Sequence, residues 1–416
     1  MNPILPKHCF VPDVEARSMP DGRLYLYGSW DRSGAQQDDY CSHELHVFST
    51  DDMEHWVDHG VIFRNTPDVP GLAWNPSSFL YAPDAIYRDG KYYLYVCGDK
   101  REEGVAVANS PTGPFSPAKR ISIADGDGID PAVFVDDDGE AYYFWGQFSL
   151  RGAKLKADMA TLIPESLTHG ILTEWEHGFH EGASIRRRGD KYYMVYTDIS
   201  RGKATCLSYA VADSPLGPYK KGGVIVDNIY CDPASWNNHG SIAQYKGQWY
   251  VFYHRSSQNR NTCRRVCVEP IFFDDEGCIC EVEQTSQGVS APMCAYESIP
   301  ARTACRIMGK SFLCPVDEEE VLSVNPDGHW GTPDWAEYKY IDFGTSDGST
   351  VLHFCVLARG KGRITLKIEG NEEISSVEVD SESFEYSRAL CKCVQGVHPL
   401  WLFLEGDLQV KEFRFE

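Results

Sequence analysis

A segment of one kind occurs five times between residues 21 and 256, and this repeat constrains the fold more than any other feature. Each copy is a turn followed by an aromatic and β-branched run, typical of a hairpin turn that opens a strand. The aligned tyrosines lie about 50 to 70 residues apart, close to the length of a four-stranded propeller blade. The repeat predicts a five-bladed β-propeller, and its tyrosines are Tyr25, Tyr93, Tyr143, Tyr193 and Tyr250.

The pattern changes after the fifth copy. ANSPTGPF and ADSPLGPY follow two of the repeats at similar distances and indicate matching turns between outer strands, and helical periodicity is nearly absent over the first ~290 residues. Beyond residue 317, shorter segments such as KYIDFG, GRITLKIEG and PLWLFLEG alternate apolar and polar residues. We therefore expect an all-β chain, with a propeller over 1–295 and a small β-sandwich of the jelly-roll type over 296–416.

Net charge limits the class of partner. The 39 basic and 61 acidic residues give a charge of -22, which repels nucleic acid and anionic membranes and suits a neutral ligand. No run approaches the ~20 apolar residues of a membrane span. Aromatic residues make up 12% of the chain, which suits stacking against sugar rings but is also common in strand-rich proteins.

Cysteine usage and the N-terminus indicate the compartment. The chain has 15 cysteines, an odd number, and many stand in strand-like segments, as Cys97, Cys206 and Cys355 do. This distribution is typical of reduced thiols, and the closely spaced cysteines lack a histidine at zinc-finger spacing. MNPILPKHCFVPD has neither the basic nor the apolar region of a signal peptide. We expect a cytoplasmic protein.

A polar side chain precedes each repeated tyrosine by 9 to 13 residues, where the innermost strand of a blade begins. Innermost strands line the central channel of a propeller, so these side chains can meet on its axis. Asp beside Pro or Gly is also ordinary turn chemistry. Carboxyl groups gathered at one place shift each other's proton affinity, and glycosidic bond cleavage needs one protonated and one ionised carboxyl group. The five residues are Asp13, Asp84, Asp130, Glu181 and His239.

Five ordered motifs at these positions resemble glycoside hydrolase family 43, in the branch of β-xylosidases and α-L-arabinofuranosidases. They are VPDVEAR, YAPDAIY, GIDPAVFVDDDG, HEGASI and NHGSI. The resemblance implies an inverting mechanism with Asp13 as general base and Glu181 as general acid. It implies that Asp130 orients the acid and favours its protonated form. It also implies a calcium ion near His239, held mainly through water, and no organic cofactor.

The same resemblance suggests residues that bind the sugar and a role for the C-terminal part. Asp84 is expected to accept hydrogen bonds from sugar hydroxyls, and a cation near the axis is expected from Arg264 or Arg265, of which we favour Arg265. Residues 296–416 resemble a family 6 carbohydrate-binding module, with Trp330, Trp335 and Trp401 as candidate contacts, although a structural role is favoured. The residues expected to wall the pocket are Trp74, Tyr81, Trp145 and Phe179.

Three functions remain open at this point. The favoured one is an exo-acting α-L-arabinofuranosidase that removes a terminal pentose from arabinoxylan- or xylan-derived oligosaccharides. A β-xylosidase, or an enzyme with both activities, is the first alternative. A propeller that binds carbohydrate without catalysis is the second, but it predicts that one of the three carboxylates is replaced, and none is. The sequence leaves the oligomeric state open.

Overall fold

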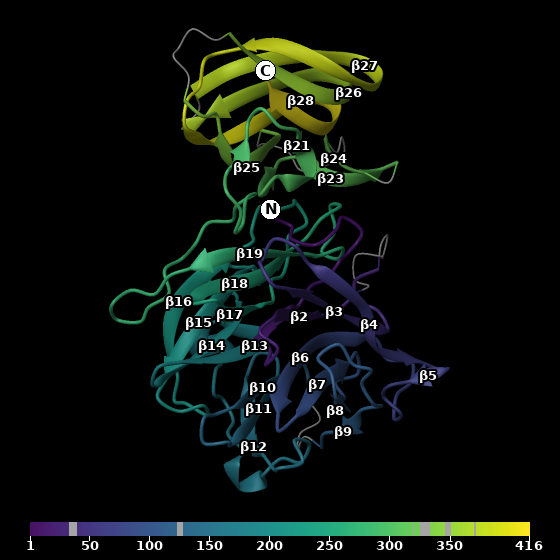
Figure 1. Cartoon of the computed structure of the whole chain (residues 1–416), viewed down its shortest axis with the longest axis vertical. Coiled ribbons are helices and arrows are strands. Elements are labelled where there is room, and N and C mark those ends of the chain that lie inside the picture. Colours follow the sequence, from purple (N-terminus) through teal and green to yellow (C-terminus); the bar gives the residue numbers. More distant parts are fainter. Residues whose placement is uncertain (33–39, 123–127, 318, 325–332, 346–350, 370–371) are drawn as a thin grey trace.

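The computed structural model describes residues 1–416 except for 33–39, 123–127, 318, 325–332, 346–350 and 370–371. Two parts lie one above the other along the long axis of the molecule, with the N-terminus between them (Figure 1). Strands dominate both parts, and the helices of the described residues are short: α1 (Glu174–His177) and the 3-10 turns at Pro164–Ser166 and Ala301–Thr303. None of the described helices has the length and apolar character needed to cross a membrane.

The first part is a five-bladed β-propeller, as the repeat predicts. Each blade is an antiparallel sheet, and the repeated tyrosines all lie in its second strand. The first two blades are β1 (Glu15–Ser18), β2 (Leu24–Gly28), β3 (Glu44–Thr50), β4 (Val57–Thr66) and β5 (Val69–Pro70), then β6 (Leu80–Arg88), β7 (Lys91–Gly98), β8 (Glu103–Ala108) and β9 (Lys119–Arg120). The third is β10 (Ala132–Val135), β11 (Ala141–Trp145) and β12 (Arg151–Leu155). The last two are β13 (Phe179–Arg188), β14 (Lys191–Asp198), β15 (Cys206–Ala212) and β16 (Lys220–Asp227), then β17 (Ser241–Tyr245), β18 (Gln248–Arg255) and β19 (Arg265–Ile271).

The blades close into a ring around the axis. Inner strands β1, β6, β10, β13 and β17 each contact the next, and β17 returns to β1. Core clusters lie between neighbouring blades, so the strands of each sheet are buried on both faces. This burial explains why their sequences are runs of apolar residues. The N-terminal segment ties the ring together, because Ile4 donates its N–H to the Val266 carbonyl and Asn2 hydrogen-bonds the backbone of Val268 in β19.

The C-terminal part is also made of strands, and their hydrogen bonds join them into one nine-stranded sheet around a single apolar core. Three of its strands are 17 to 20 residues long. The jelly-roll sandwich stays a prediction. Trp335 and Trp401 are half-buried in adjacent strands, and Trp330 lies outside the described residues. The strands are β20 (Met293–Cys294), β21 (Ile299–Pro300), β22 (Arg306–Met308), β23 (Ser311–Val316), β24 (Glu319–Val324), β25 (Trp335–Asp342), β26 (Leu352–Ile368), β27 (Glu372–Cys391) and β28 (Val397–Phe415).

Buried polar contacts join the two parts. Arg255 at the end of β18 donates to the Ala304 carbonyl, and Arg265 at the start of β19 forms an ion pair with Glu320 of β24. Both members of that ion pair are almost fully buried. Strand β20 already pairs with β25, so the C-terminal sheet begins at Met293, three residues before the predicted start of the second part at residue 296.

Candidate active site

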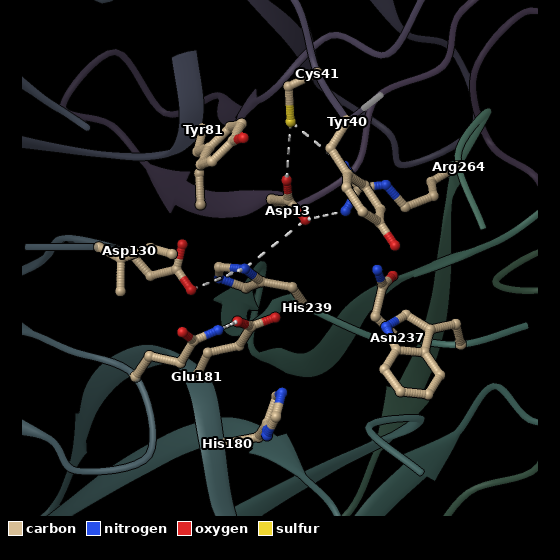
Figure 2. A pocket seen from close by; sticks show the side chains of 14 residues that line it. Asp13, Tyr40, Cys41, Tyr81, Asp130, His180, Glu181, Asn237, His239 and Arg264 are labelled. Carbon is tan, nitrogen blue, oxygen red and sulfur yellow. Dashed lines mark hydrogen bonds and ion pairs between the residues drawn. The ribbon is translucent and has the colours of Figure 1, made fainter. Parts of the chain in front are cut away.

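A pocket of about 340 Å³ opens where the inner strands begin. All of its lining residues belong to the propeller. Figure 2 shows Asp13, Asp130 and Glu181 gathered around the imidazole of His239, so the structure brings four of the five predicted axial residues together. The lining residues are Asp13, Tyr40, Cys41, Tyr81, Ala82, Ile129, Asp130, Gln147, His180, Glu181, Trp236, Asn237, His239 and Arg264.

The backbone at the strand starts aims these side chains inward. Asp13 and Asp130 precede β1 and β10 with φ of 57° and 54°, a left-handed conformation that Asp tolerates better than most residues. Gly182 follows Glu181 with φ of 69°, and a Cβ atom there would stand 3.0 Å from the His239 ring. The motifs PD, IDP and HEG therefore reflect local geometry as well as chemistry.

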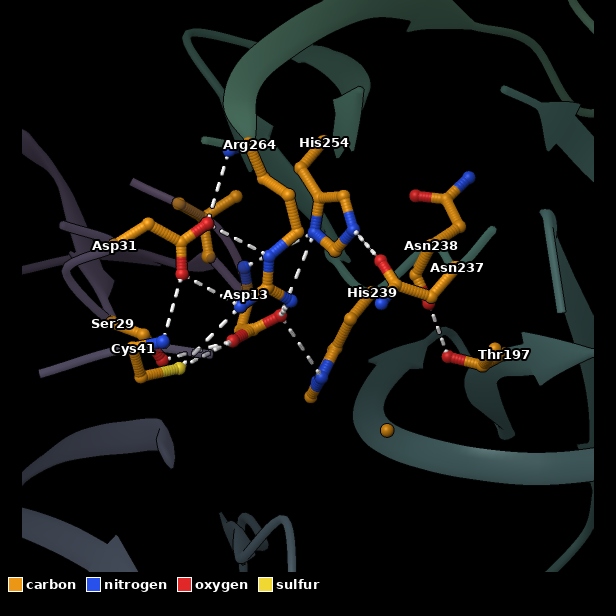
Figure 3. A network of polar contacts seen from close by, with 12 residues as sticks. Asp13, Ser29, Asp31, Cys41, Thr197, Asn237, Asn238, His239, His254 and Arg264 are labelled. Atoms are coloured by element: carbon orange, nitrogen blue, oxygen red, sulfur yellow. Dashed lines mark hydrogen bonds and ion pairs between the residues drawn. The ribbon is translucent and has the colours of Figure 1, made fainter. Parts of the chain in front are cut away.

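Asp13 lies at the centre of a buried polar network (Figure 3). Arg264 donates from Nη1 to Asp13 Oδ1 at 2.9 Å, and Ser29 Oγ donates to Oδ2 at 2.9 Å. Asp31 in turn accepts hydrogen bonds from Nε and Nη2 of Arg264, at 3.0 Å each. Burial opposes the charge of Arg264, but Asp13 and Asp31 raise its pKa well above the ordinary value, so the guanidinium beside Asp13 stays charged.

His254 supports the same residue from behind. Burial, and then the charges of Arg264 and His239, hold the pKa of His254 well below its ordinary value, so the ring is neutral. Its Nδ1 accepts the backbone N–H of Asp13, so Nε2 carries the proton and donates to Asn237 Oδ1 at 2.7 Å. One neutral imidazole thus links the backbone of Asp13 to Asn237, which lines the pocket.

Glu181 has different surroundings. Gln147 donates from Nε2 to Glu181 Oε2 at 2.7 Å, and Arg101 donates from Nη2 to Gln147 Oε1 at 2.9 Å. Because a guanidinium can only donate, the oxygen of the Gln147 amide must face Arg101 and its nitrogen must face Glu181. When Glu181 is protonated, this contact leaves Oε1 as the oxygen that can carry the proton.

Asp130 is the buried neighbour of both groups. Burial first, and then the negative charges of Glu181 and Asp13, raise the pKa of Asp130 well above its ordinary value. The backbone N–H of Gly182 donates to Asp130 Oδ2 at 3.1 Å and fixes the carboxyl group beside the Glu181 strand. Because the charge of Glu181 contributes to this shift, the ionisation of Asp130 is coupled to that of Glu181.

The structure corrects several predicted pocket residues. Trp145 and Phe179 are fully buried and pack in the cores between blades. Trp74 packs against the core between the first two blades. Asp84 lies one layer below the pocket, where Arg17 and two backbone N–H groups occupy its oxygens. Of the four aromatic residues predicted to wall the pocket, Tyr81 alone lines it.

The choice between the two arginines is also corrected. Arg264 reaches Asp13, whereas Arg265 points to Glu320 in the C-terminal part. Side chains of consecutive extended residues point to opposite sides, so one arginine must leave the axis, but the sequence does not mark which. The sequence interpretation also missed Gln147, which lies two residues after the end of β11 at Trp145, and Cys41, whose Sγ lies 3.9 Å from Asp13 Oδ2.

Comparison with known proteins decides the family. The model of the glycosyl hydrolases family 43 matches residues 1–279, the whole propeller but for its last few residues. The chain belongs to glycoside hydrolase family 43. It is therefore a glycosidase, and the alternative of a propeller that only binds carbohydrate is not supported.

Relatives within family 43 carry two kinds of name. A xylosidase/arabinosidase of Thermoclostridium stercorarium is 35% identical over 74% of this chain and 72% of its own length. An arabinoxylan arabinofuranohydrolase of Bacillus subtilis is 24% identical over all of this chain and 91% of its own. A solved β-xylosidase/α-arabinofuranosidase from a compost metagenome, in complex with xylotriose, is 28% identical over 68% of this chain and 97% of its own, with a TM-score of 0.57.

Proposed function

We propose that this family 43 enzyme is an inverting exo-glycosidase that removes a terminal pentose from arabinoxylan- or xylan-derived oligosaccharides, with α-L-arabinofuranosidase activity favoured. One observation carries the proposal. Asp13 is paired with a guanidinium, whereas Glu181 in the same pocket is bound to a neutral amide. Carboxyl groups in such different surroundings can hold opposite protonation states, as glycoside hydrolysis requires.

In the proposed reaction the ionised Asp13 accepts a proton from water as that water attacks the anomeric carbon. Glu181 donates its proton to the departing glycosidic oxygen. Asp130 orients Glu181, and repulsion between the two carboxyl groups keeps that donor protonated. Arg264 holds Asp13 in place before the water is bound. The water enters on the face opposite the leaving group, so the product has inverted configuration and no covalent intermediate forms.

The shape of the pocket supports exo action. Its volume of about 340 Å³ suits one sugar residue, and the buried charged layer that contains Asp84 closes the axis beneath it. Trp236 and Phe148, the latter in edge contact with His180, are each about half exposed near the mouth. We assign the terminal pentose to the pocket and the rest of the oligosaccharide to this aromatic rim.

β-Xylosidase activity, alone or beside arabinofuranosidase activity, is the second candidate. The names of three matching relatives favour this candidate, because each of these names gives both activities. The C-terminal part is proposed to be structural, since the described pocket lining takes no residue from it. A cytoplasmic location is proposed from buried free thiols such as Cys97, Cys206 and Cys355.

A side-by-side assay tests the proposal. Purified enzyme is given an aryl α-L-arabinofuranoside and an aryl β-D-xyloside, and we expect kcat/KM to be at least about tenfold higher for the former. The reverse ratio would assign the enzyme as a xylosidase. Proton NMR of the first sugar released should show the opposite anomer to the substrate, and retained configuration would contradict the proposed mechanism.

A further inference from the structure

Four charged side chains form a buried layer on the propeller axis directly beneath the pocket. Glu15 and Arg17 follow Asp13 along β1 at steps of two residues, so they point to the same side of the strand. Asp84 comes from β6 and Arg186 from β13. None of the four side chains is more than 11% exposed. We call these four residues the axial layer.

The axial layer is a continuous chain of ion pairs. Arg17 Nη2 lies 2.6 Å from Asp84 Oδ2 and 3.1 Å from Glu15 Oε1. Arg186 Nη2 lies 2.7 Å from the same Glu15 oxygen. Two carboxylates and two guanidiniums alternate, so the layer is neutral as a whole.

Backbone groups complete the hydrogen bonding. Arg17 donates to the Val133 carbonyl at 3.0 Å, and Val133 donates its N–H to Asp84 Oδ2 at 2.7 Å. Arg186 donates to the Ala16 carbonyl at 2.7 Å, and Ser184 Oγ donates to Glu15 Oε1 at 3.0 Å. The layer therefore fastens inner strands of four of the five blades to one another.

A calcium ion does not fit this layer. Calcium takes six to eight oxygen ligands, as a rule including carboxylates. Here Glu15 Oε1 and both oxygens of Asp84 already accept hydrogen bonds, and the two guanidiniums repel a further cation. Above the layer, His239 Nδ1 faces Asp13 Oδ1 and Asp130 Oδ2 at 3.8 and 4.0 Å, and these two oxygens already accept hydrogen bonds from Arg264 and from the backbone N–H of Gly182. Within the described ranges, no three His, Cys, Asp or Glu side chains are arranged to hold a metal ion.

We infer that the ion pairs of Arg17 and Arg186 join the inner strands on the propeller axis without a bound cation, so that neither folding nor activity of this chain depends on the calcium ion that the family resemblance implies near His239. Each guanidinium is covalently part of the chain and cannot be removed by a chelator. The inference does not rest on the substrate or on the stereochemistry proposed above.

The first experiment compares the wild-type protein in excess EDTA and in millimolar calcium chloride. We expect thermal unfolding midpoints within about 1 °C of each other, kcat/KM values within about twofold, and no heat of binding when calcium is titrated into the EDTA-treated, desalted protein. A calcium-dependent rise in the midpoint, or binding of one calcium per chain, would overturn the inference.

The second experiment tests the ion pairs themselves by thermal unfolding. Arg186→Met leaves Glu15 with one fewer partner in a buried site, so we expect the midpoint to fall by about 5 °C or more. Arg363→Met removes an exposed pair with Glu378 and is the matched control, with an expected change below about 1 °C. The double variant Glu15→Gln, Arg186→Met should lose clearly less than the sum of the two single losses.

If Arg186→Met does not fold, Glu15→Gln alone decides the question. The amide keeps the shape of the Glu15 side chain but removes its charge, so the variant should fold with a lowered midpoint that calcium does not restore. Strict additivity in the double variant, or recovery of either single variant to the wild-type midpoint by calcium, would contradict the proposed role of these ion pairs.

Discussion

Asp13 lies in a buried pocket, and a chain of contacts holds it in place as the proposed base. Arg264 donates to its carboxylate, and Asp31 holds the Arg264 guanidinium with two hydrogen bonds while staying outside the pocket lining. Asp31 is therefore a positioning residue, because it acts on the base through the guanidinium.

Replacing the base should abolish turnover without unfolding the protein. Asp13→Asn keeps the side-chain shape and an oxygen that can accept from Arg264, but it cannot take a proton from water. We expect kcat/KM to fall by about three to four orders of magnitude while the circular dichroism spectrum is unchanged. Ser29→Ala, which removes one donor to the Asp13 carboxylate, is the control and should cost less than about tenfold. Comparable losses in both variants would mean that Asp13 is not the base.

The amide of Gln147 should matter most when the leaving group needs a proton. Gln147→Met keeps the bulk but removes the donor to Glu181 Oε2, so the acid is no longer held by that contact. We expect a loss of about tenfold or more with an oligosaccharide and a much smaller one with a dinitrophenyl glycoside, whose leaving group departs unprotonated. An equal loss with both substrates would assign Gln147 to sugar binding.

The pH profile should report the coupling between Asp130 and Glu181. The pKa of Asp130 is raised, so its proton is retained above the ordinary range, and negative charge develops beside Glu181 only as the pH rises. In Asp130→Asn that charge never forms. The ionised form of Glu181 then meets less repulsion, so Glu181 loses its proton more easily. The alkaline limb of kcat/KM should then move to lower pH, by about one unit. Activity measured from about pH 5 to about pH 9 tests this, and an unmoved limb would exclude the coupling.

At the scale of the elements, the loops that precede the inner strands shape the mouth of the pocket. Trp236 lies in the loop before β17, lines the pocket and is 50% exposed. His180 lines the pocket at the start of β13, and the short helix α1 places Glu174 within 3.1 Å of it. These segments lie where the second sugar of an oligosaccharide would emerge from the pocket.

Trp236→Ala should therefore weaken binding of oligosaccharides more than binding of small aryl glycosides. Loss of one stacking surface is expected to raise KM for a trisaccharide by about tenfold and to leave kcat for an aryl pentoside within about threefold. Phe272→Ala is the matched control, because Phe272 is 60% exposed but does not line the pocket. The assignment fails if the two variants have the same KM.

The sequence predicted the blades and the axial residues because both depend on local pattern. A turn followed by Tyr at a regular interval, and a polar residue at or near the start of each inner strand, can be read residue by residue. The aromatic residues of the pocket could not be predicted from such a pattern. The sheets are buried on both faces, so no alternation of apolar and polar residues shows which way Trp145 and Phe179 point. Contacts between distant segments, such as Arg101 with Gln147, leave no local pattern at all.

At the scale of the whole molecule, two adjacent arginines connect the pocket to the C-terminal part. Arg264 holds Asp13, and Arg265 is paired with Glu320 of β24 while it donates to the Lys7 carbonyl. Burial lowers the pKa of Arg265, although Glu320 opposes this shift. The position of the strand start that carries Arg264 thus depends on a contact between the two parts.

Breaking that contact should destabilise the protein and disturb the pocket together. Glu320→Gln leaves the Arg265 charge buried without its carboxylate, so we expect the free energy of unfolding to fall by about 3 kcal/mol, measured by urea denaturation. The neighbouring Glu319→Gln removes an exposed pair with Lys7 and should cost less than about 0.5 kcal/mol. At a temperature where both variants are folded, kcat/KM should fall about threefold or more in Glu320→Gln alone, because Arg264 adjoins the displaced residue and a small misplacement of a catalytic group is costly. A destabilised Glu320→Gln variant with wild-type kcat/KM would mean that the junction stabilises the chain without positioning Arg264.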